Sequence, residues 1–134
     1  MTNLVCNLNY LVNTTRGNAV IMNNIINVFL KETPEELSAL HDAIEKINYS
    51  IISDISHKIK SSFAIMGISI LEPILEEMEH LGTIGSGIEK IEQLNGGVNT
   101  VFRQAVEEMR ERTKGMEMEN TKPEYRQAGS PFNI

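Results

Sequence analysis

The chain has 134 residues, a length that suits one domain with its own hydrophobic core. Hydrophobic residues make up 41% of it, but with no Trp, three Tyr and four Phe the core must be mainly aliphatic, which favours helices packed on helices. The net charge of −6 and the scattered Lys and Arg argue against nucleic-acid binding, which needs clustered basic side chains.

The compartment is indicated by the cysteine content and by the N-terminal residues. Cys6 is the only cysteine, so no disulfide can form within the chain and a reducing compartment is the simpler expectation. The first residues lack both a basic start and a long apolar run, and no stretch approaches ~18 continuous apolar residues. We therefore expect a soluble, cytoplasmic protein that does not enter a membrane.

The first third of the chain predicts a short helix followed by longer ones. Leu4, Leu8 and Leu11 have the spacing of a short amphipathic helix before a turn at residues 13–18. Residues 18–31 are apolar on most sides, as in a helix with several neighbours. In the TPEEL sequence that follows, Thr33 can cap a helix and Pro34 suits its first position, so a new helix or a kinked continuation begins there.

The helix that begins at TPEEL and the two helices after it are predicted from apolar stripes at helical spacing. The first ends near Asn48, the second ends at Gly67, and the third carries Pro73 in its first turn. Their stripes consist of Leu37, Leu40, Ile44 and Ile47; then Ile52, Ile55, Ile59, Phe63 and Met66; then Leu71, Ile74, Leu75, Met78 and Leu81.

The last part of the chain predicts a connector, one more helix and a tail. Residues 82–97 are rich in glycine and are expected to connect two helices, with at most one short helix inside them. A stripe of Val98, Val101, Phe102, Ala105 and Met109 predicts a final helix to about Arg112. Residues 113–134 show no periodicity, so we predict an irregular and flexible tail. The expected fold is all-α: an antiparallel four-helix bundle over residues 1–112 with a short N-terminal helix, followed by the tail.

One histidine lies opposite a predicted core stripe. At about 100° per residue, His57 points roughly 170° away from the stripe of its own helix and must face solvent. No second His or Cys lies three or four residues away, which argues against a metal site. Geometry alone indicates no more than a surface residue. Its helical neighbours are mostly short and would leave the imidazole on a low, flat patch: Ser53, Asp54, Lys60, Ser61 and Ala64.

The sequence HKIKSSFAIMG, residues 57–67, resembles the signature of histidine-containing phosphotransfer (HPt) domains. Residues 17–82 are also similar to that family in their order of helix, acidic Pro-containing junction, helix, histidine helix and return helix. The resemblance makes His57 the phosphoacceptor, Lys60 the lysine of the motif and Gly67 its closing glycine. Ser61 departs from the family, in which this position is most often Gly, but serine is still small.

The resemblance implies a phosphorelay in which His57 exchanges a phosphoryl group with an aspartate of a response-regulator receiver domain. The expected partners are that receiver domain and a sensor or hybrid histidine kinase, and the chain itself is expected to be a monomer. The receiver would supply Mg²⁺, so no intrinsic cofactor is expected. Lys60 would compensate the phosphoryl charge and Lys58 would add to the local field. The expected docking surface consists of Ser53, Asp54, Lys58, Ser61 and Ala64.

Two other histidines and a second motif fit a functional site less well. His80 is flanked by Glu76, Glu77 and Glu79, which would repel a phosphoryl group, and His41 lies at the edge of a stripe, so we expect it to be half-buried. The Glu-x-x-His spacing at residues 77–80 occurs once only, which argues against a two-metal site.

The glycine-rich residues 82–87 lack the Gly-Lys-Ser/Thr of a phosphate loop, so no kinase activity with ATP is expected. The alternative function is a helical adaptor of the same fold that binds partners without phosphorylation. Such an adaptor would be expected to show a contiguous exposed apolar groove.

Overall fold

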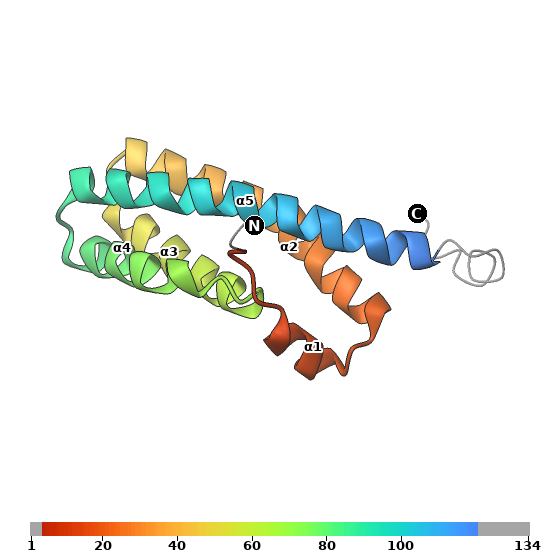
Figure 1. Ribbon diagram of the computed structural model, residues 1–134. Helices are drawn as coiled ribbons and strands as arrows, with labels where there is room; N and C mark the ends of the chain where they lie inside the picture. The colour runs from red at the N-terminus through yellow and green to blue at the C-terminus, as the bar shows by residue number, and fades with distance from the viewer. Residues whose placement is uncertain (1–3, 121–134) are drawn as a thin grey trace.

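A computed structural model describes the backbone of residues 4–120 and the side chains of residues 4–112. Within this part the chain is all-helical, and α2 to α5 form an antiparallel bundle with α1 at one end (Figure 1). The predicted all-α four-helix bundle with a short N-terminal helix is therefore confirmed. Its elements are α1 (Asn9–Thr15), α2 (Ala19–Glu45), α3 (Tyr49–Ile65), a 3-10 turn η1 (Ser69–Leu71), α4 (Glu72–Ile84) and α5 (Ile88–Asn120).

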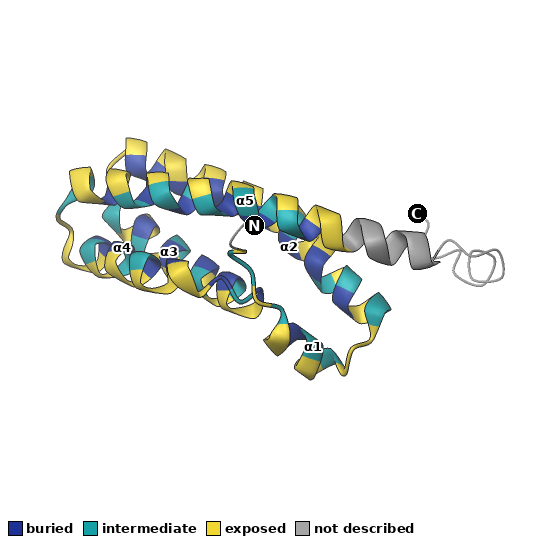
Figure 2. Cartoon of the chain, in the orientation of Figure 1, coloured by how far each residue is buried: buried dark blue, intermediate teal, exposed yellow. Residues whose placement is uncertain are grey.

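The core lies between the four long helices, and Figure 2 shows one buried face along each of them. The predicted stripes of α3, α4 and α5 supply it, with Ile55, Ile74, Leu81 and Val101 only partly buried. The stripe predicted for the second half of α2 is buried as well, except for Ile47, which follows the end of the helix and is exposed. Three rings join α2, α3 and α5: Phe63 lies 5.7 Å from Phe29 and 6.2 Å from Phe102, measured between ring centroids. Such aromatic contacts contribute beyond the area they bury, so they help to hold the inner face of α3 against α2 and α5.

α2 is one continuous helix that passes through Thr33 and Pro34. Thr33 is buried in the bundle and does not cap a helix, so of the two predicted alternatives a new helix start is wrong and a continuation of the same helix is what the structure has. Phe29 and Leu37 lie on either side of the proline and are both buried. Burial of both sides of the junction keeps the helix intact, although proline removes one helical hydrogen bond.

The ends of three other helices differ from the expectation. Leu4 is exposed and precedes α1, which begins only at Asn9. The connector between α4 and α5 is limited to residues 85–87, and Gly96 and Gly97 lie inside α5. Val98 is buried next to them, so tertiary packing overrides the low helix propensity of glycine.

The last helix runs to Asn120 and not to about Arg112. The domain boundary at residues 112 and 113 stays a prediction, and the part of the expected tail from residue 121 to 134 lies outside the described residues. None of the helices in the described part of the chain is both long enough and apolar enough to cross a membrane.

Candidate functional site

His57 lies on the outer side of α3, as its position opposite the stripe predicts. Asn48 caps the start of this helix, and its side-chain Oδ1 accepts a hydrogen bond from the backbone N–H of Ile51 at 3.2 Å. Ile52 and Ile59 anchor the opposite face and are fully buried. The side chain of His57 is 65% exposed, so the ring is accessible to a second protein.

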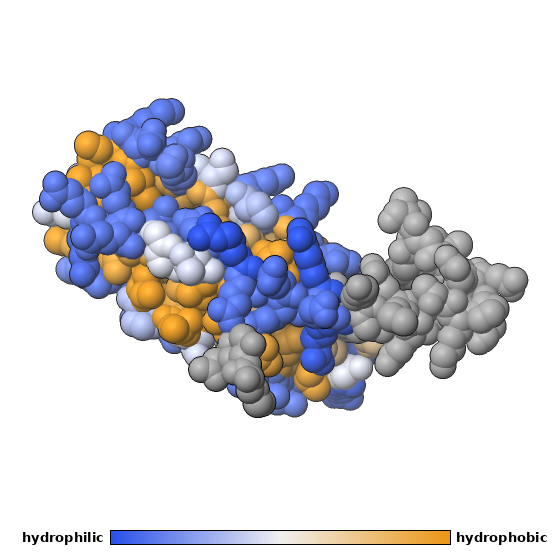
Figure 3. All heavy atoms as spheres, turned by 45° about the horizontal axis from the view of Figure 1, so that its top comes forward, coloured by the Kyte–Doolittle hydropathy of each residue, from blue (hydrophilic) through white to orange (hydrophobic). Residues whose placement is uncertain are grey.

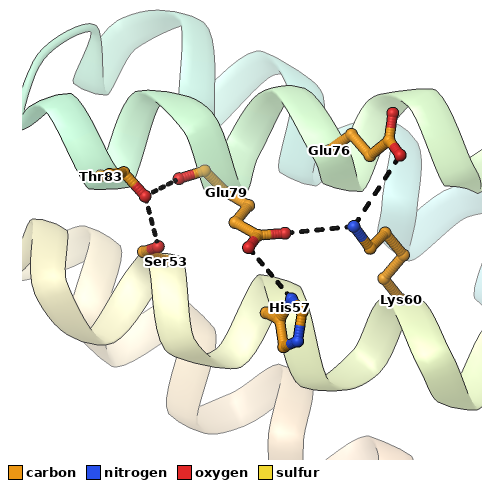
Figure 4. Close-up of polar contacts among 6 residues, drawn as sticks. All are labelled: Ser53, His57, Lys60, Glu76, Glu79 and Thr83. Carbon is orange, nitrogen blue, oxygen red and sulfur yellow. Dashed lines mark hydrogen bonds and ion pairs between the residues drawn. The ribbon is translucent and has the colours of Figure 1, made fainter.

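A glutamate of the neighbouring helix contacts the imidazole. Oε2 of Glu79, on α4, lies 3.0 Å from Nδ1 of His57, and Oε1 of the same carboxylate lies 3.2 Å from Nζ of Lys60 (Figure 4). Because an ionised carboxylate only accepts hydrogen bonds, Nδ1 carries the ring proton of the neutral imidazole. The lone pair is then on Nε2, which points away from Glu79 (Figure 4).

Lys60 lies between two carboxylates. Besides Glu79, it pairs with Oε2 of Glu76 at 3.9 Å, and its side chain is only 23% exposed. Lys60, which the family resemblance implies for charge compensation, is therefore already paired with the carboxylate beside the histidine. With both its oxygens engaged, Glu79 is oriented by one cation and one ring N–H.

The same seam between α3 and α4 holds a second polar contact. Oγ of Ser53 lies 2.9 Å from Oγ1 of Thr83, and Thr83 Oγ1 donates to the carbonyl oxygen of Glu79 at 2.9 Å. Ser53 is half-buried in this seam, in contrast to the exposed Asp54. The remaining small residues of the predicted docking surface, Ser61 and Ala64, are exposed on α3.

Lys58 faces the other neighbouring helix. Its Nζ lies 2.8 Å from Oε2 of Glu36 on α2. That hydrogen bond, together with the charge of Glu36, raises the pKa of Lys58. Lys58 is thus charged but paired, which weakens its contribution to the field around His57.

The other two histidines lie in different surroundings. His80 is exposed, and two of the glutamates expected around it, Glu76 and Glu79, turn towards Lys60 on α3. The expectation that His41 is half-buried is wrong: its side chain is 65% exposed and its Nε2 lies 3.7 Å from Oε2 of Glu45. His41 lies just past the edge of the buried stripe, where the helix already faces solvent. Within the described residues, no group of three or more His, Cys, Asp or Glu side chains could hold a metal ion.

The contact with Glu79 was missed from the sequence. A signal was present, because His57 and Glu79 are equidistant along the chain from Ile68, as are Ser53 and Thr83, and Lys60 and Glu76. In two antiparallel helices joined by a tight turn, such positions face each other. A turn centred on Ile68 therefore predicts that Glu79 lies opposite His57.

Comparison with known proteins identifies one family. Residues 24–113 match the Hpt domain, and they include α3, α4 and all six residues of Figure 4. No curated protein and no solved structure matches the chain. Because the match covers more than half of it, the chain belongs to the Hpt domain family. Hpt domains are phosphocarrier modules of two-component signalling and not kinases, so the chain has a phosphotransfer role.

Proposed function

We propose that this Hpt domain carries the phosphoryl group on Nε2 of His57 and relays it to and from the aspartate of a receiver domain. The contact between His57 Nδ1 and Glu79 Oε2 is the observation that carries the proposal. It selects the tautomer in which the exposed nitrogen holds the lone pair. His57 is then a nucleophile that needs no base to remove a proton first.

Transfer of the phosphoryl group between the aspartate and His57 needs no further reactant. The Nε2 lone pair attacks the phosphorus of the aspartyl phosphate, the bond from phosphorus to the aspartate oxygen breaks, and its electron pair leaves with the carboxylate. Nδ1 keeps its proton, so the ring becomes cationic while the phosphoryl group carries negative charge. Glu79 stabilises the cationic ring through the same hydrogen bond, and the reverse sequence returns the phosphoryl group to an aspartate.

Lys60 has two effects on this step. Its ion pair with Glu79 offsets the negative charge of that carboxylate, which would otherwise oppose the approach of a phosphoryl group. It also adds positive charge one helical turn from His57, where it compensates charge on the transferred group. Mg²⁺ belongs, in this proposal, to the acidic pocket of the receiver domain.

The docking surface is the exposed strip of α3 around the histidine. Asp54, Ser61 and Ala64 lie there, and the two small side chains leave room for the rim of a receiver active site. Lys58, held by Glu36, borders the strip on the side of α2. The partners of this surface are a response-regulator receiver domain and a sensor or hybrid kinase, met by a monomer in the cytoplasm.

The adaptor alternative is disfavoured by family membership more than by the surface. On the face drawn in Figure 3, side chains are mainly hydrophilic, with hydrophobic ones exposed in separate groups between them. The groove between α2 and α3, lined by Ile25, Val28 and Ile65 among others, has a volume of about 110 Å³, which is below the size of most ligand pockets, about 300 Å³ and above. A larger groove of about 800 Å³ lies between the N-terminal segment and α5, lined by Leu4 and Met109 among others. Grooves alone therefore do not separate the two functions, and membership of the Hpt domain family favours phosphotransfer.

Incubation with a phosphorylated receiver domain tests the proposal. We expect the chain to acquire phosphate that is labile in acid and stable in base, and His57→Gln to abolish it without loss of helicity. His80→Gln and His41→Gln are the matched controls and should label like the parent. Labelling that survives His57→Gln and disappears in His80→Gln or His41→Gln would overturn the assignment.

A further inference from the structure

The contact between Ser53 and Thr83 lies one helical turn from the contact between His57 and Glu79. Ser53 precedes His57 by one turn of α3, and Thr83 follows Glu79 by one turn of α4. Because the two helices are antiparallel, the two contacts are neighbours along one seam (Figure 4). Any shift of α4 along α3 therefore changes both distances together.

The protons of this contact can be assigned. The carbonyl oxygen of Glu79 can only accept, so the Thr83 hydroxyl donates to it at 2.9 Å. Thr83 has no second proton, so Ser53 donates to Thr83 across the seam at 2.9 Å. Two consecutive hydrogen bonds thus join α3 to the backbone of Glu79, the residue whose carboxylate contacts His57.

Gly82 sets how closely the two helices approach at the same place. A Cβ atom at this position would lie 2.8 Å from the backbone nitrogen of Ser53 and 2.8 Å from the carbonyl oxygen of Tyr49. Both are backbone atoms of α3 and cannot rotate aside. Glycine therefore permits a separation of the helices that any larger residue would increase.

We propose that Gly82, Ser53 and Thr83 are positioning residues that hold Glu79 where its carboxylate meets Nδ1 of His57. The inference rests on the proposed function and extends it to the control of the tautomer. An ion pair or hydrogen bond between partly exposed, flexible side chains is weak unless its geometry is preset. Glu79 is 29% exposed and His57 65% exposed, so a fixed backbone beneath Glu79 decides how fully the contact forms.

Thr83→Val tests the inference, because it keeps the shape of the side chain and removes its hydroxyl. The ¹⁵N chemical shifts of the imidazole report which ring nitrogen of His57 is protonated, and a labelled receiver reports the transfer rate. We expect Thr83→Val to lower the Nδ1–H fraction and to slow transfer by about three- to tenfold. Thr83→Ser, which keeps a hydroxyl, should restore both the Nδ1–H fraction and the transfer rate.

Thr100→Val is the matched control. Thr100 also donates to the carbonyl four residues earlier, that of Gly96, and is exposed like Thr83, but it lies on α5 and not on the seam between α3 and α4. The Thr100→Val variant should leave the tautomer of His57 and the rate of phosphoryl transfer unchanged. Gly82→Ala should act like Thr83→Val but more strongly, and circular dichroism of each variant checks the fold.

A double-mutant cycle separates positioning from general stability. In a Glu79→Ala background, Thr83→Val should slow transfer no further, because the contact it positions is already lost. An additive effect, or an unchanged tautomer in Thr83→Val, would overturn the inference. If the parent accepts no phosphoryl group at all, the proposed function fails, and the tautomer measurement still decides whether Thr83 positions Glu79.

Discussion

The backbone carbonyl of Asn7 occupies the space in which a side chain at position 67 would lie. Gly67 has a φ of +67°, and its carbonyl oxygen accepts a hydrogen bond from the backbone N–H of Asn7 at 3.2 Å. The glycine that closes the histidine motif is thus required twice, by a left-handed backbone and by the close approach of the N-terminal segment. It ends α3 and fastens the segment before α1 in the same place.

Gly67→Ala should destabilise the protein much more than Gly17→Ala. Gly17 has a similar φ of +72°, but nothing lies within 4 Å of the place that an alanine Cβ would take, so alanine there costs only about 1–2 kcal/mol for the left-handed backbone. At Gly67 the clash with Asn7 adds to this, and we expect about 3 kcal/mol or more. Urea unfolding measures the loss of stability in each variant. Equal losses for Gly67→Ala and Gly17→Ala would show that the N-terminal segment moves away freely.

Glu108 on α5 holds the other side of the N-terminal segment. Its carboxylate accepts hydrogen bonds from the backbone N–H groups of Val5 at 2.8 Å and Cys6 at 3.0 Å. Burial raises the pKa of Glu108, but these bonds, with those from the side chains of Gln104 and Cys6, outweigh it and leave the pKa below its ordinary value. For Cys6, burial and then the charge of Glu108 raise the thiol pKa to about 12, so the thiol stays protonated at neutral pH.

The stability that Glu108 contributes should disappear in acid. Since its pKa is lower in the folded than in the unfolded chain, the contribution is complete above the unfolded value, about 4.3, and is lost as the pH falls through the folded value. Glu108→Gln should cost about 1 kcal/mol at pH 7 and less at low pH. Unfolding curves against pH measure this, with the exposed Glu107→Gln as control. Parallel curves for parent and Glu108→Gln would contradict it.

Glu79→Ala should slow phosphoryl transfer by about one to two orders of magnitude, because Nδ1 of His57 loses its acceptor and Nε2 loses part of its lone-pair population. Glu79→Gln should be milder, since an amide oxygen can still accept from Nδ1. Single-turnover transfer from a labelled receiver gives the rates. Lys60→Ala, which removes the other partner of the Glu79 carboxylate, is measured beside it. A transfer rate in Glu79→Ala equal to that of the parent would show that another group sets the tautomer of His57.

Ser61→Arg should keep the bundle folded and slow transfer severely. Ser61 is exposed one turn after His57, so a long side chain there obstructs a receiver that approaches the ring. Ser61→Gly should preserve transfer at a helix cost of about 0.5 kcal/mol. Ser38→Arg places the same charge on an exposed position of α2 and serves as control. Undiminished transfer by Ser61→Arg would mean that the receiver docks elsewhere.

Pro34→Ala should raise the free energy of unfolding. Proline inside a helix costs about 3 kcal/mol, and α2 continues through Pro34 with the side chain exposed, so alanine restores a hydrogen bond without loss of packing. We expect a gain of about 1–3 kcal/mol by urea unfolding, and little change for the neighbouring Glu35→Ala. A loss of stability would indicate that the proline shapes α2 for its partners.

The helical class, the inner faces of α3, α4 and α5 and the outward direction of His57 follow from the amino-acid sequence alone. Each of these depends on the period of one helix. Ile52, Ile59 and Phe63 recur at the spacing that buries one face, and that spacing places His57 on the other face wherever the helix lies. Helix ends were less well predicted, because Gly96, Gly97 and Pro34 oppose helix locally while buried neighbours maintain it.

The surroundings of the histidine depend on how α4 packs on α3. Within a single helix Glu79 is expected beside His80, whereas the packing of α4 on α3 turns its carboxylate to His57 and Lys60. Likewise, the requirement for glycine at Gly67 and Gly82 comes from backbone atoms of Asn7, Tyr49 and Ser53. The position of one helix along another depends on contacts summed over both, and no periodicity within either helix specifies it.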